Sequence, residues 1–433
     1  MTTMPTSRDH ALRYDALRDG IAADAQDQSE RDSRIFVHGT LIACLILQRF
    51  GAMPGGSAVF ISLPAFGLLL GLGLSSGIAT LRPRGVALYL AFAACTLIST
   101  LIALTTPDGR FGTSVSSVVA ILVTYGFTMI GPSVRFDRAT VFRLFLAYTR
   151  VIAAAGIVQW LVQFVGIRIF SFMVTVPALK PVLVEQLYNF NPIMHYGSTV
   201  MRSNGFFLLE PSMLSQTLVI AVVIEYFILG RVKYLPLYLV SYILSFSGTG
   251  ALSLALAVPF YACLSARNFG RVAGFLIAGV VALALGSIVF PEQIGSILGR
   301  TNELSYSRSS GYARFIGPFL PIAELSHEAR ILIGWGPGAT ERYLYFKEGT
   351  GNSIAKLITD YGAIGITAFM AMFVGTLWRR EIAILSVLAL TTFIIGGGYL
   401  LFTPMLVLLF LLCIWGGVPS DAAVAIDGGV RPA

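Results

Sequence analysis

Residues 200–214 read Val-Met-Arg-Ser-Asn-Gly-Phe-Phe-Leu-Leu-Glu-Pro-Ser-Met-Leu, and they join a long polar segment to an apolar one. Arg202 and Glu210 lie in this stretch, Pro211 follows at once, and Ser212 falls in the first turn of a predicted helix. Only 12% of the chain is charged, and here two opposite charges fall at the edge of an apolar run. We expect the fold to hold this stretch, and a second one at 300–314, over a membrane surface.

The composition indicates a membrane protein. Of the 433 residues, 56% are hydrophobic, and the charged share is about half of the roughly 25% that is usual in soluble proteins. The net charge of +8 does not indicate nucleic acid as a partner, because many of the Lys and Arg residues fall in short connections where they set membrane topology. We expect membrane lipids to surround the chain.

The apolar runs predict an all-α polytopic membrane protein with about twelve transmembrane helices. These are expected at 35–50, 57–80, 85–104, 113–130, 141–165, 212–229, 234–246, 251–266, 272–290, 353–378, 382–395 and 400–415. Residues 1–34 mix both charges and are expected to form a disordered cytoplasmic tail, and 417–433 a second cytoplasmic tail. Between them, 35–416 form a single transmembrane domain, with a tight turn or helix break predicted at 245–250.

Basic pairs in alternate short connections predict the orientation. The pairs are Arg82/Arg84, Arg135/Arg138, Arg231/Lys233, Arg267/Arg271 and Arg379/Arg380. Read as cytoplasmic, they obey the positive-inside rule and place both termini inside. The two long loops, about 166–211 and 291–352, then lie on the outer side, with short interfacial helices expected near 180–188 and 315–325.

Arginines are concentrated in these outer loops. They are Arg202, Arg300, Arg308, Arg314 and Arg342. Loops of this length are usually functional, and a guanidinium can pair with two phosphate oxygens at once. The group therefore favours recognition of a lipid with a diphosphate head. Anchoring to phospholipid heads or pairing with nearby carboxylates is the alternative for each single arginine.

The other ionisable residues divide into site candidates and structural ones. Glu210 could cap a helix, or it could activate a hydroxyl and orient Arg202. Arg150 and Glu225 fall at similar depth in neighbouring helices, and we predict an ion pair rather than a proton path. His195 and His327 lie in the outer loops and are possible bases, although a solvated histidine is the commoner outcome. No spacing of Cys, His and carboxylates predicts a metal, and we expect no cofactor.

Three motifs, in order, resemble the O-antigen ligase and Wzy-type polysaccharide polymerase superfamily. Residues 202–211, Arg-Ser-Asn-Gly-Phe-Phe-Leu-Leu-Glu-Pro, are similar to its R-x-x-G-x-x-x-x-E-P element. Residues 331–338, Ile-Leu-Ile-Gly-Trp-Gly-Pro-Gly, resemble its l-G-x-G-x-G turn. Residues 352–365 resemble its H-N-x-x-L-x-x-x-x-E-Y-G-x-x-G helix start. The order, spacing and expected topology agree over residues 40–415.

The resemblance implies a GT-C-like glycosyltransferase of the bacterial inner membrane, with its active site facing the periplasm and no metal. Its substrate would be an oligosaccharide linked to undecaprenyl diphosphate, and a flippase and a chain-length-regulating copolymerase are implied as partners. Arg202 and Arg314 match the arginines that bind the diphosphate, with Arg300 and Arg308 next; Arg300 also begins an R-x(10)-G pattern ending at Gly311. We assign substrate binding to Arg300, Arg308, Asn352, Ser212 and Tyr312.

Two departures from the family pattern favour a polymerase over a ligase. The ligase-like His before Asn is Gly351, which removes the expected ligase base and leaves Glu210 and His327 as candidates. The Ser-Arg pair often found after the seventh helix is Ser247-Gly248. A ligase that transfers glycan to another acceptor remains one alternative. A transporter or flippase of lipid-linked sugar is another, although internal repeats and mid-membrane charges would be expected there.

Overall fold

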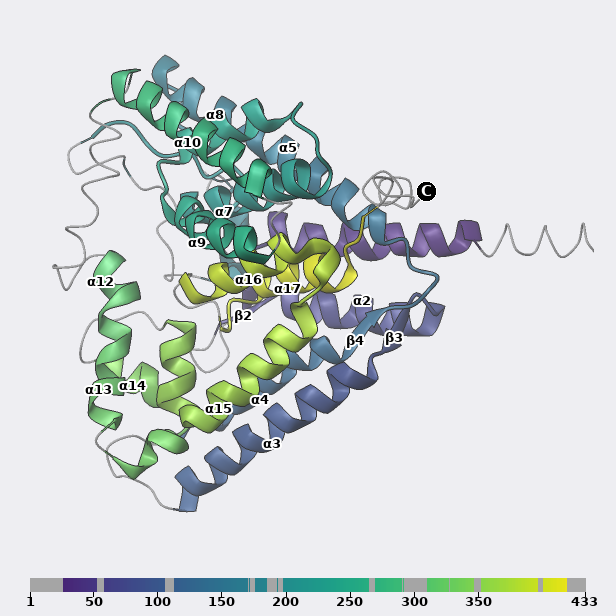
Figure 1. Cartoon of the computed structure of the whole chain (residues 1–433), viewed down its shortest axis with the longest axis vertical. Helices are drawn as coiled ribbons and strands as arrows, with labels where there is room; N and C mark the ends of the chain where they lie inside the picture. Colours follow the sequence, from purple (N-terminus) through teal and green to yellow (C-terminus); the bar gives the residue numbers. More distant parts are fainter. Residues whose placement is uncertain are drawn as a thin grey trace, which may run out of the picture.

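Helices make up almost all of the regular structure in the computed structural model (Figure 1). The structure describes residues 26–52, 58–105, 113–169, 171, 176–184, 193, 198–264, 269–289, 291, 310–326, 328–345, 352–395 and 400–418. Within these ranges the strands are confined to two short antiparallel pairs. β1 (Gly51–Ala52) pairs with β2 (Val59–Phe60), and β3 (Ala79–Leu81) pairs with β4 (Ile130–Pro132). The all-α prediction is therefore confirmed.

Each predicted apolar segment contains a helix. The elements are residues 26–41 with η1 (Ile42–Ile46), α2 (Ser62–Ser76), α3 (Pro83–Thr105), α4 (Val115–Gly126) with η3 (Phe127–Met129), α5 (Arg138–Val162) with η4 (Gln163–Val165), α7 (Pro211–Val222) with η6 (Val223–Ile228), α8 (Leu235–Ser245), α9 (Thr249–Leu264), α10 (Phe269–Val289), α15 (Ser353–Leu377), η11 (Arg380–Ile382), α16 (Ala383–Ile395) and α17 (Thr403–Phe410) with η12 (Leu411–Trp415). Among the described residues, 4 helical stretches are long and apolar enough to cross a membrane, namely Pro83–Thr105, Arg138–Val165, Pro211–Ile228 and Ser353–Leu377. Several shorter apolar helices accompany them, so the fold is compatible with membrane insertion.

The first helix differs from the prediction at its start. Residues 26–34, which we expected in the tail, are already helical. Tertiary contacts explain the extension: Ser29 Oγ donates to the Arg135 carbonyl at 2.6 Å, and Ser33 Oγ accepts from the Asp137 backbone N–H at 3.3 Å. Charge composition alone cannot reveal such contacts with a distant loop.

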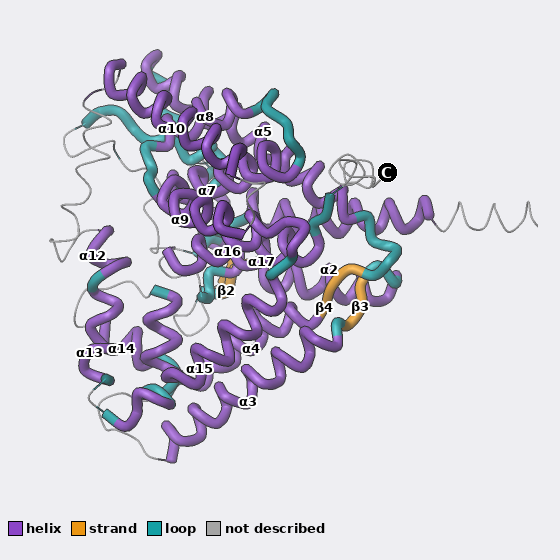
Figure 2. The backbone as a smooth tube through the Cα atoms, in the orientation of Figure 1, coloured by secondary structure: helices purple, strands orange, loops and turns teal. Residues whose placement is uncertain are grey.

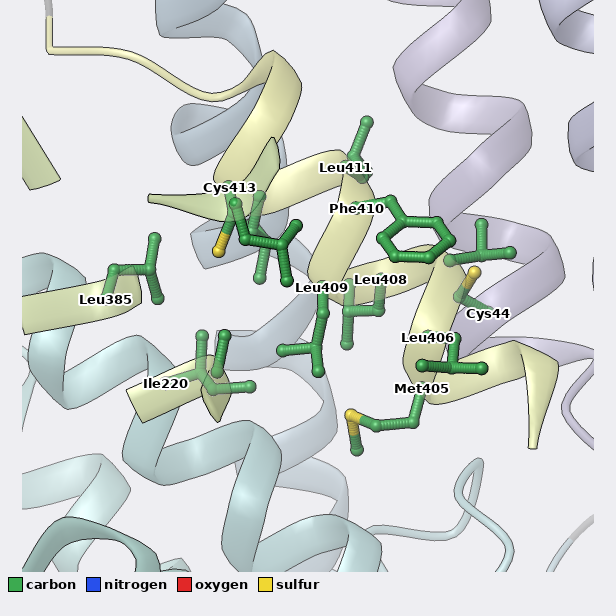
Figure 3. Packing of buried hydrophobic residues seen from close by; sticks show 14 of the residues in the cluster. Cys44, Ile220, Leu385, Met405, Leu406, Leu408, Leu409, Phe410, Leu411 and Cys413 are labelled. Carbon is green, nitrogen blue, oxygen red and sulfur yellow. The ribbon is translucent and has the colours of Figure 1, made fainter. Parts of the chain in front are cut away.

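The centre of the bundle is formed by α17 and η12, whose side chains are buried on all sides. Figure 3 shows Leu409 pointing toward Ile220 of α7, whereas Phe410 lies on the other side, near Cys44 of η1. Leu385 of α16 belongs to the same buried cluster. A helix that is apolar all round belongs in such a position. The peripheral helices α3 and α10 instead leave many large apolar side chains exposed, as a lipid-facing helix would.

The predicted ion pair between Arg150 and Glu225 is confirmed. Arg150 Nη2 donates to Glu225 Oε1 at 2.6 Å, and the Glu225 side chain is 1% exposed. The guanidinium also lies 3.8 Å from the centre of the Tyr234 ring. The pair joins α5 to η6, and a buried charge of this kind requires its partner.

The two ends of the bundle differ in chemistry. The β3–β4 pair, seen together in Figure 2, marks one end, where Arg82, Arg84, Arg138 and Arg379 lie; we call it the arginine end. The opposite end, the loop end, carries α12 (Ser310–Phe315), η9 (Gly317–Phe319), α13 (Leu320–Leu325), η10 (Ala329–Leu332) and α14 (Ala339–Tyr345) (Figure 1). Both α3 and α15 run from one end to the other.

Short helices occur in both of the long loop segments. The predicted interfacial segment at 315–325 is divided between α12, η9 and α13. In the first loop, a 3-10 helix, η5, spans Pro177–Val182, and most of the predicted 180–188 segment beyond it lies outside the described residues.

Candidate active site

The Arg202 stretch is held against α5 by two glutamines. Gln163 Oε1 accepts from the Met201 N–H at 2.9 Å, and Gln159 Oε1 accepts from the Ser203 hydroxyl at 3.0 Å and the Asn204 N–H at 3.1 Å. Gln159 lies in α5 and Gln163 is the first residue of η4, which directly continues that helix. These hydrogen bonds fix the backbone on both sides of Arg202, so the point from which its side chain extends is held in place.

Arg202 lines a small pocket together with a second arginine, Arg168. The lining residues are Gln159, Trp160, Gln163, Arg168, Ile169, Met201, Arg202 and Ser203. Trp160 Nε1 is buried here and has no hydrogen-bond partner among the described residues. Two guanidinium groups and an indole N–H are all donors, so the chemistry of this pocket suits an anion.

A glycine allows the chain to pass between α5 and α7 after Arg202. Gly205 has φ +73°, and a Cβ there would lie 2.7 Å from Ile152 Cγ2 and 3.1 Å from Leu214 Cδ1. Only glycine meets both requirements without strain. The glycine of the first motif is thus explained by packing.

Glu210 occupies the N-cap position of α7, with Pro211 at the first helical position, as predicted. Its carboxylate makes no capping bond to the helix backbone. Instead, Oε2 accepts a hydrogen bond from the Ser212 hydroxyl at 2.8 Å. The carboxylate therefore already accepts from a hydroxyl, which is the geometry of a proton acceptor.

Arg314 reaches the turn between α8 and α9. Its Nη1 lies 3.5 Å from Thr249 Oγ1, a long hydrogen bond to the first residue of α9. The turn itself occupies the predicted position, with Phe246 in the left-handed region at φ +45°. The other side of the same turn receives the first motif, because the Ser203 N–H donates to the Leu244 carbonyl at 3.0 Å.

Small hydroxyl residues connect this turn to the start of α7. The Ser215 hydroxyl lies 3.2 Å from Ser247 Oγ and accepts from the Gly250 N–H at 3.2 Å. A Cβ at Gly250 would lie 2.5 Å from the Ser215 carbonyl oxygen, so α9 approaches α7 at backbone distance. The start of α7, which Glu210 precedes, is thus linked by hydroxyl groups to the turn that Arg314 reaches.

The second and third motifs are docked onto each other. Residues Gly334, Gly336 and Gly338 all have positive φ, and we call residues 334–338 the glycine loop. The Trp335 N–H donates to the Thr359 carbonyl at 2.8 Å and the Gly336 N–H to the Asp360 carbonyl at 3.0 Å. These carbonyls are available because α15 is kinked at Gly362, whose φ of 68° and ψ of −170° are not helical.

A buried charge network, which the sequence analysis did not identify, fastens this loop. Asp360 Oδ2 accepts from the Gly338 N–H at 3.1 Å, and Oδ1 accepts from the Thr340 N–H at 2.9 Å and its hydroxyl at 2.7 Å. Lys356 Nζ contacts Asp360 Oδ2 at 2.5 Å and Glu341 Oε1 at 2.7 Å. Asp360 is fully buried, whereas the Glu341 side chain is 60% exposed.

The remaining predicted site residues have different outcomes. Asn352 caps α15, since its Oδ1 accepts from the Ile354 N–H at 2.9 Å and its Nδ2 donates to the Ile394 carbonyl at 2.8 Å. It is 2% exposed, so this capping role occupies the side chain that we had assigned to substrate. Tyr312 is half-buried in α12 beside Arg314. Arg300, Arg308 and His327 lie outside the described residues, as does His195.

Among the described residues, no group of three His, Cys, Asp or Glu side chains could hold a metal ion. Comparison of the chain with protein-family models, with curated proteins and with solved structures gives no match.

Proposed function

We propose that the protein is a polysaccharide polymerase of the bacterial inner membrane, with a GT-C-like fold of about twelve spans and both termini in the cytoplasm. It would transfer a growing glycan from undecaprenyl diphosphate to a lipid-linked repeat unit on the periplasmic side. A flippase would supply the repeat units, and a copolymerase would regulate chain length.

The observation that carries this proposal is the turn between α8 and α9. It contacts the Arg202 stretch through the Leu244 carbonyl and Arg314 through Thr249. The residue after Arg202 and the side chain of Arg314, from loops far apart in sequence, thereby contact opposite sides of one turn. Arg314 contacts Thr249, which follows Gly248, the position where the superfamily that the motifs resemble often carries an arginine, so we infer that Arg314 replaces this charge.

The chemistry then follows from charge stabilisation. An acceptor hydroxyl oxygen bonds to the anomeric carbon of the donor sugar while the bond from that carbon to the diphosphate oxygen breaks. The diphosphate leaves on its lipid, and Arg202 and Arg314 stabilise the charge that develops on it. The hydroxyl proton passes to a base, for which Glu210 is suited by its contact with the Ser212 hydroxyl, with His327 as the alternative.

The proposal is tested by incubating the purified, reconstituted protein with a lipid-linked repeat unit and separating the products on a gel. A polymerase gives a ladder of lipid-linked oligomers. A ligase gives no ladder and instead transfers glycan when another acceptor is added, and a transporter moves the substrate without forming any glycosidic bond. The Arg314→Ala variant should lose the ladder, while Arg342→Ala, which alters an exposed arginine of α14, should retain it. A ladder from Arg314→Ala equal to that of the wild type would remove Arg314 from the site.

A further inference from the structure

Four arginines from separate segments meet at the arginine end. Arg82 directly precedes α3, Arg84 lies in its first turn, Arg138 begins α5, and Arg379 follows α15. The aliphatic part of the Arg82 side chain packs over Gly131 of β4, where any Cβ would clash with Arg82 Cδ. Backbone contacts help to bring Arg138 and Arg379 together.

Two glycines after η12 bring Arg138 and Arg379 together. The Gly416 carbonyl accepts from Arg379 Nη1, and the Gly417 N–H donates to the Arg138 carbonyl at 3.2 Å. A Cβ at Gly417 would lie 2.8 Å from Arg138 Cβ, so glycine is required for this approach. Main-chain contacts of the two glycines therefore help to keep Arg138 and Arg379 close together.

The positive charge of this cluster is poorly compensated within the described residues. Glu381 pairs with Arg379 at 2.5 Å and is 69% exposed. Asp137 caps α5 and pairs with Arg143 at 3.3 Å. Arg82 Nη1 is buried and has no hydrogen-bond partner among the described residues. Burial lowers the pKa of Arg82, and the charges of Arg379, Arg138 and Arg84 lower it further. An external anion would relieve this repulsion.

Exposed apolar side chains adjoin the cluster. Leu81 of β3 is 59% exposed, and Leu74 of α2 and Val134, just after β4, are also exposed. A free phosphate would satisfy only the guanidinium groups. A phosphate that carries acyl chains would cover the guanidinium groups and the apolar surface together.

We propose that the arginine end binds the headgroup phosphate of an anionic phospholipid, with Arg82 and Arg379 against the phosphate and Arg84 and Arg138 beside it. Guanidinium pairs phosphate oxygens in two-pronged geometry, and basic sites between helices recognise anionic headgroups. This inference goes beyond the proposed function and does not depend on it, because it concerns the opposite end of the molecule.

The test is a titration of the purified full chain in neutral detergent, with bound lipid counted by native mass spectrometry. Phosphatidylglycerol, phosphatidylcholine with the same acyl chains, and inorganic phosphate are added separately. We expect tighter binding of phosphatidylglycerol than of either other probe. Arg82→Gln and Arg84→Gln should each weaken it about fivefold. Arg84 is exposed, so its variant serves even where Arg82→Gln does not fold.

Arg143→Gln is the matched control, since this arginine lies at the same end but is already paired with Asp137. It should leave the affinity for phosphatidylglycerol unchanged. Equal binding of the two lipids, equally tight binding of inorganic phosphate, or equal effects of all three substitutions would each overturn the proposal. Equal binding of the two lipids would rule out selectivity for anionic headgroups. Equally tight binding of inorganic phosphate would rule out a role for the acyl chains, and equal effects of the substitutions would rule out this location for the site.

Discussion

The two ends of α15 hold their charges in opposite ways. At its start, at the loop end, Lys356 lies between two carboxylates, Asp360 and Glu341. Just beyond its last residue, at the arginine end, Arg379 joins Arg82, Arg84 and Arg138 with Glu381 as its carboxylate partner. Charges that are balanced inside the chain can serve as fasteners for the backbone, as Asp360 does for the glycine loop. Charges that are not balanced inside the chain can instead attract an anion from outside.

The largest effect on stability should come from breaking the balanced network. Asp360→Asn leaves Lys356 buried beside only the exposed Glu341, so we expect a loss of about 3–5 kcal/mol in the free energy of unfolding. Glu341→Gln is the control, because the Glu341 side chain is 60% exposed. This substitution should lower the free energy of unfolding by no more than about 1 kcal/mol. Both are measured by thermal unfolding in one detergent. Equal losses in the two variants would mean that Asp360 does not fasten the loop.

The Arg150–Glu225 pair is an intermediate case, because it is balanced but belongs to neither of these two clusters. Arg150→Ala leaves Glu225 buried without its cation, and we expect about 3 kcal/mol of destabilisation together with a lower yield of folded protein. Yield is measured by fluorescence-detected gel filtration of solubilised membranes. Normal abundance and an unchanged melting temperature would show that Glu225 does not need this partner.

A smaller loss of stability should follow when a glycine of the glycine loop is replaced by alanine. A Cβ at Gly334 would lie 2.5 Å from the Asp360 carbonyl oxygen, and φ is +79°, so Gly334→Ala should cost about 2–3 kcal/mol. Gly166→Ala separates the cost of a positive φ from the cost of a steric clash, since Gly166 has φ +83° but nothing within 4 Å of its Cβ position. It should cost about 1 kcal/mol. Equal melting temperatures for the two variants would argue against close docking of the loop on α15.

The smallest effect should be the response of the arginine end to salt. Its charges repel one another, so raising ionic strength should stabilise lipid-free protein slightly, by under about 1 kcal/mol, through screening. Arg84→Gln should reduce this response, whereas Arg143→Gln should not. A melting temperature that falls with salt in the wild type would contradict an excess of positive charge.

The sequence predicted features that depend on local pattern. The apolar runs contain helices, the turn before Thr249 is present, and the spacing of Arg150 and Glu225 gave their pairing. It did not predict the role of Asp360, because a lysine and an aspartate four residues apart also suit an exposed helix face. Their burial depends on the glycine loop folding over a kink at Gly362, which is a tertiary event. Asn352 was likewise assigned to substrate, since its capping bonds become visible only once α15 and the Ile394 carbonyl are in place.

The central claim, that Arg202 and Arg314 receive a departing diphosphate, is tested most directly by the release of undecaprenyl diphosphate. Purified wild type, Arg202→Ala and Arg342→Ala are reconstituted with the lipid-linked repeat unit, and the initial rate of release is measured by chromatography. We predict one diphosphate released for each linkage formed by the wild type, an unchanged rate for Arg342→Ala, and a loss of at least about 100-fold for Arg202→Ala. An Arg202→Ala protein that is folded and releases undecaprenyl diphosphate at the wild-type rate would contradict the claim.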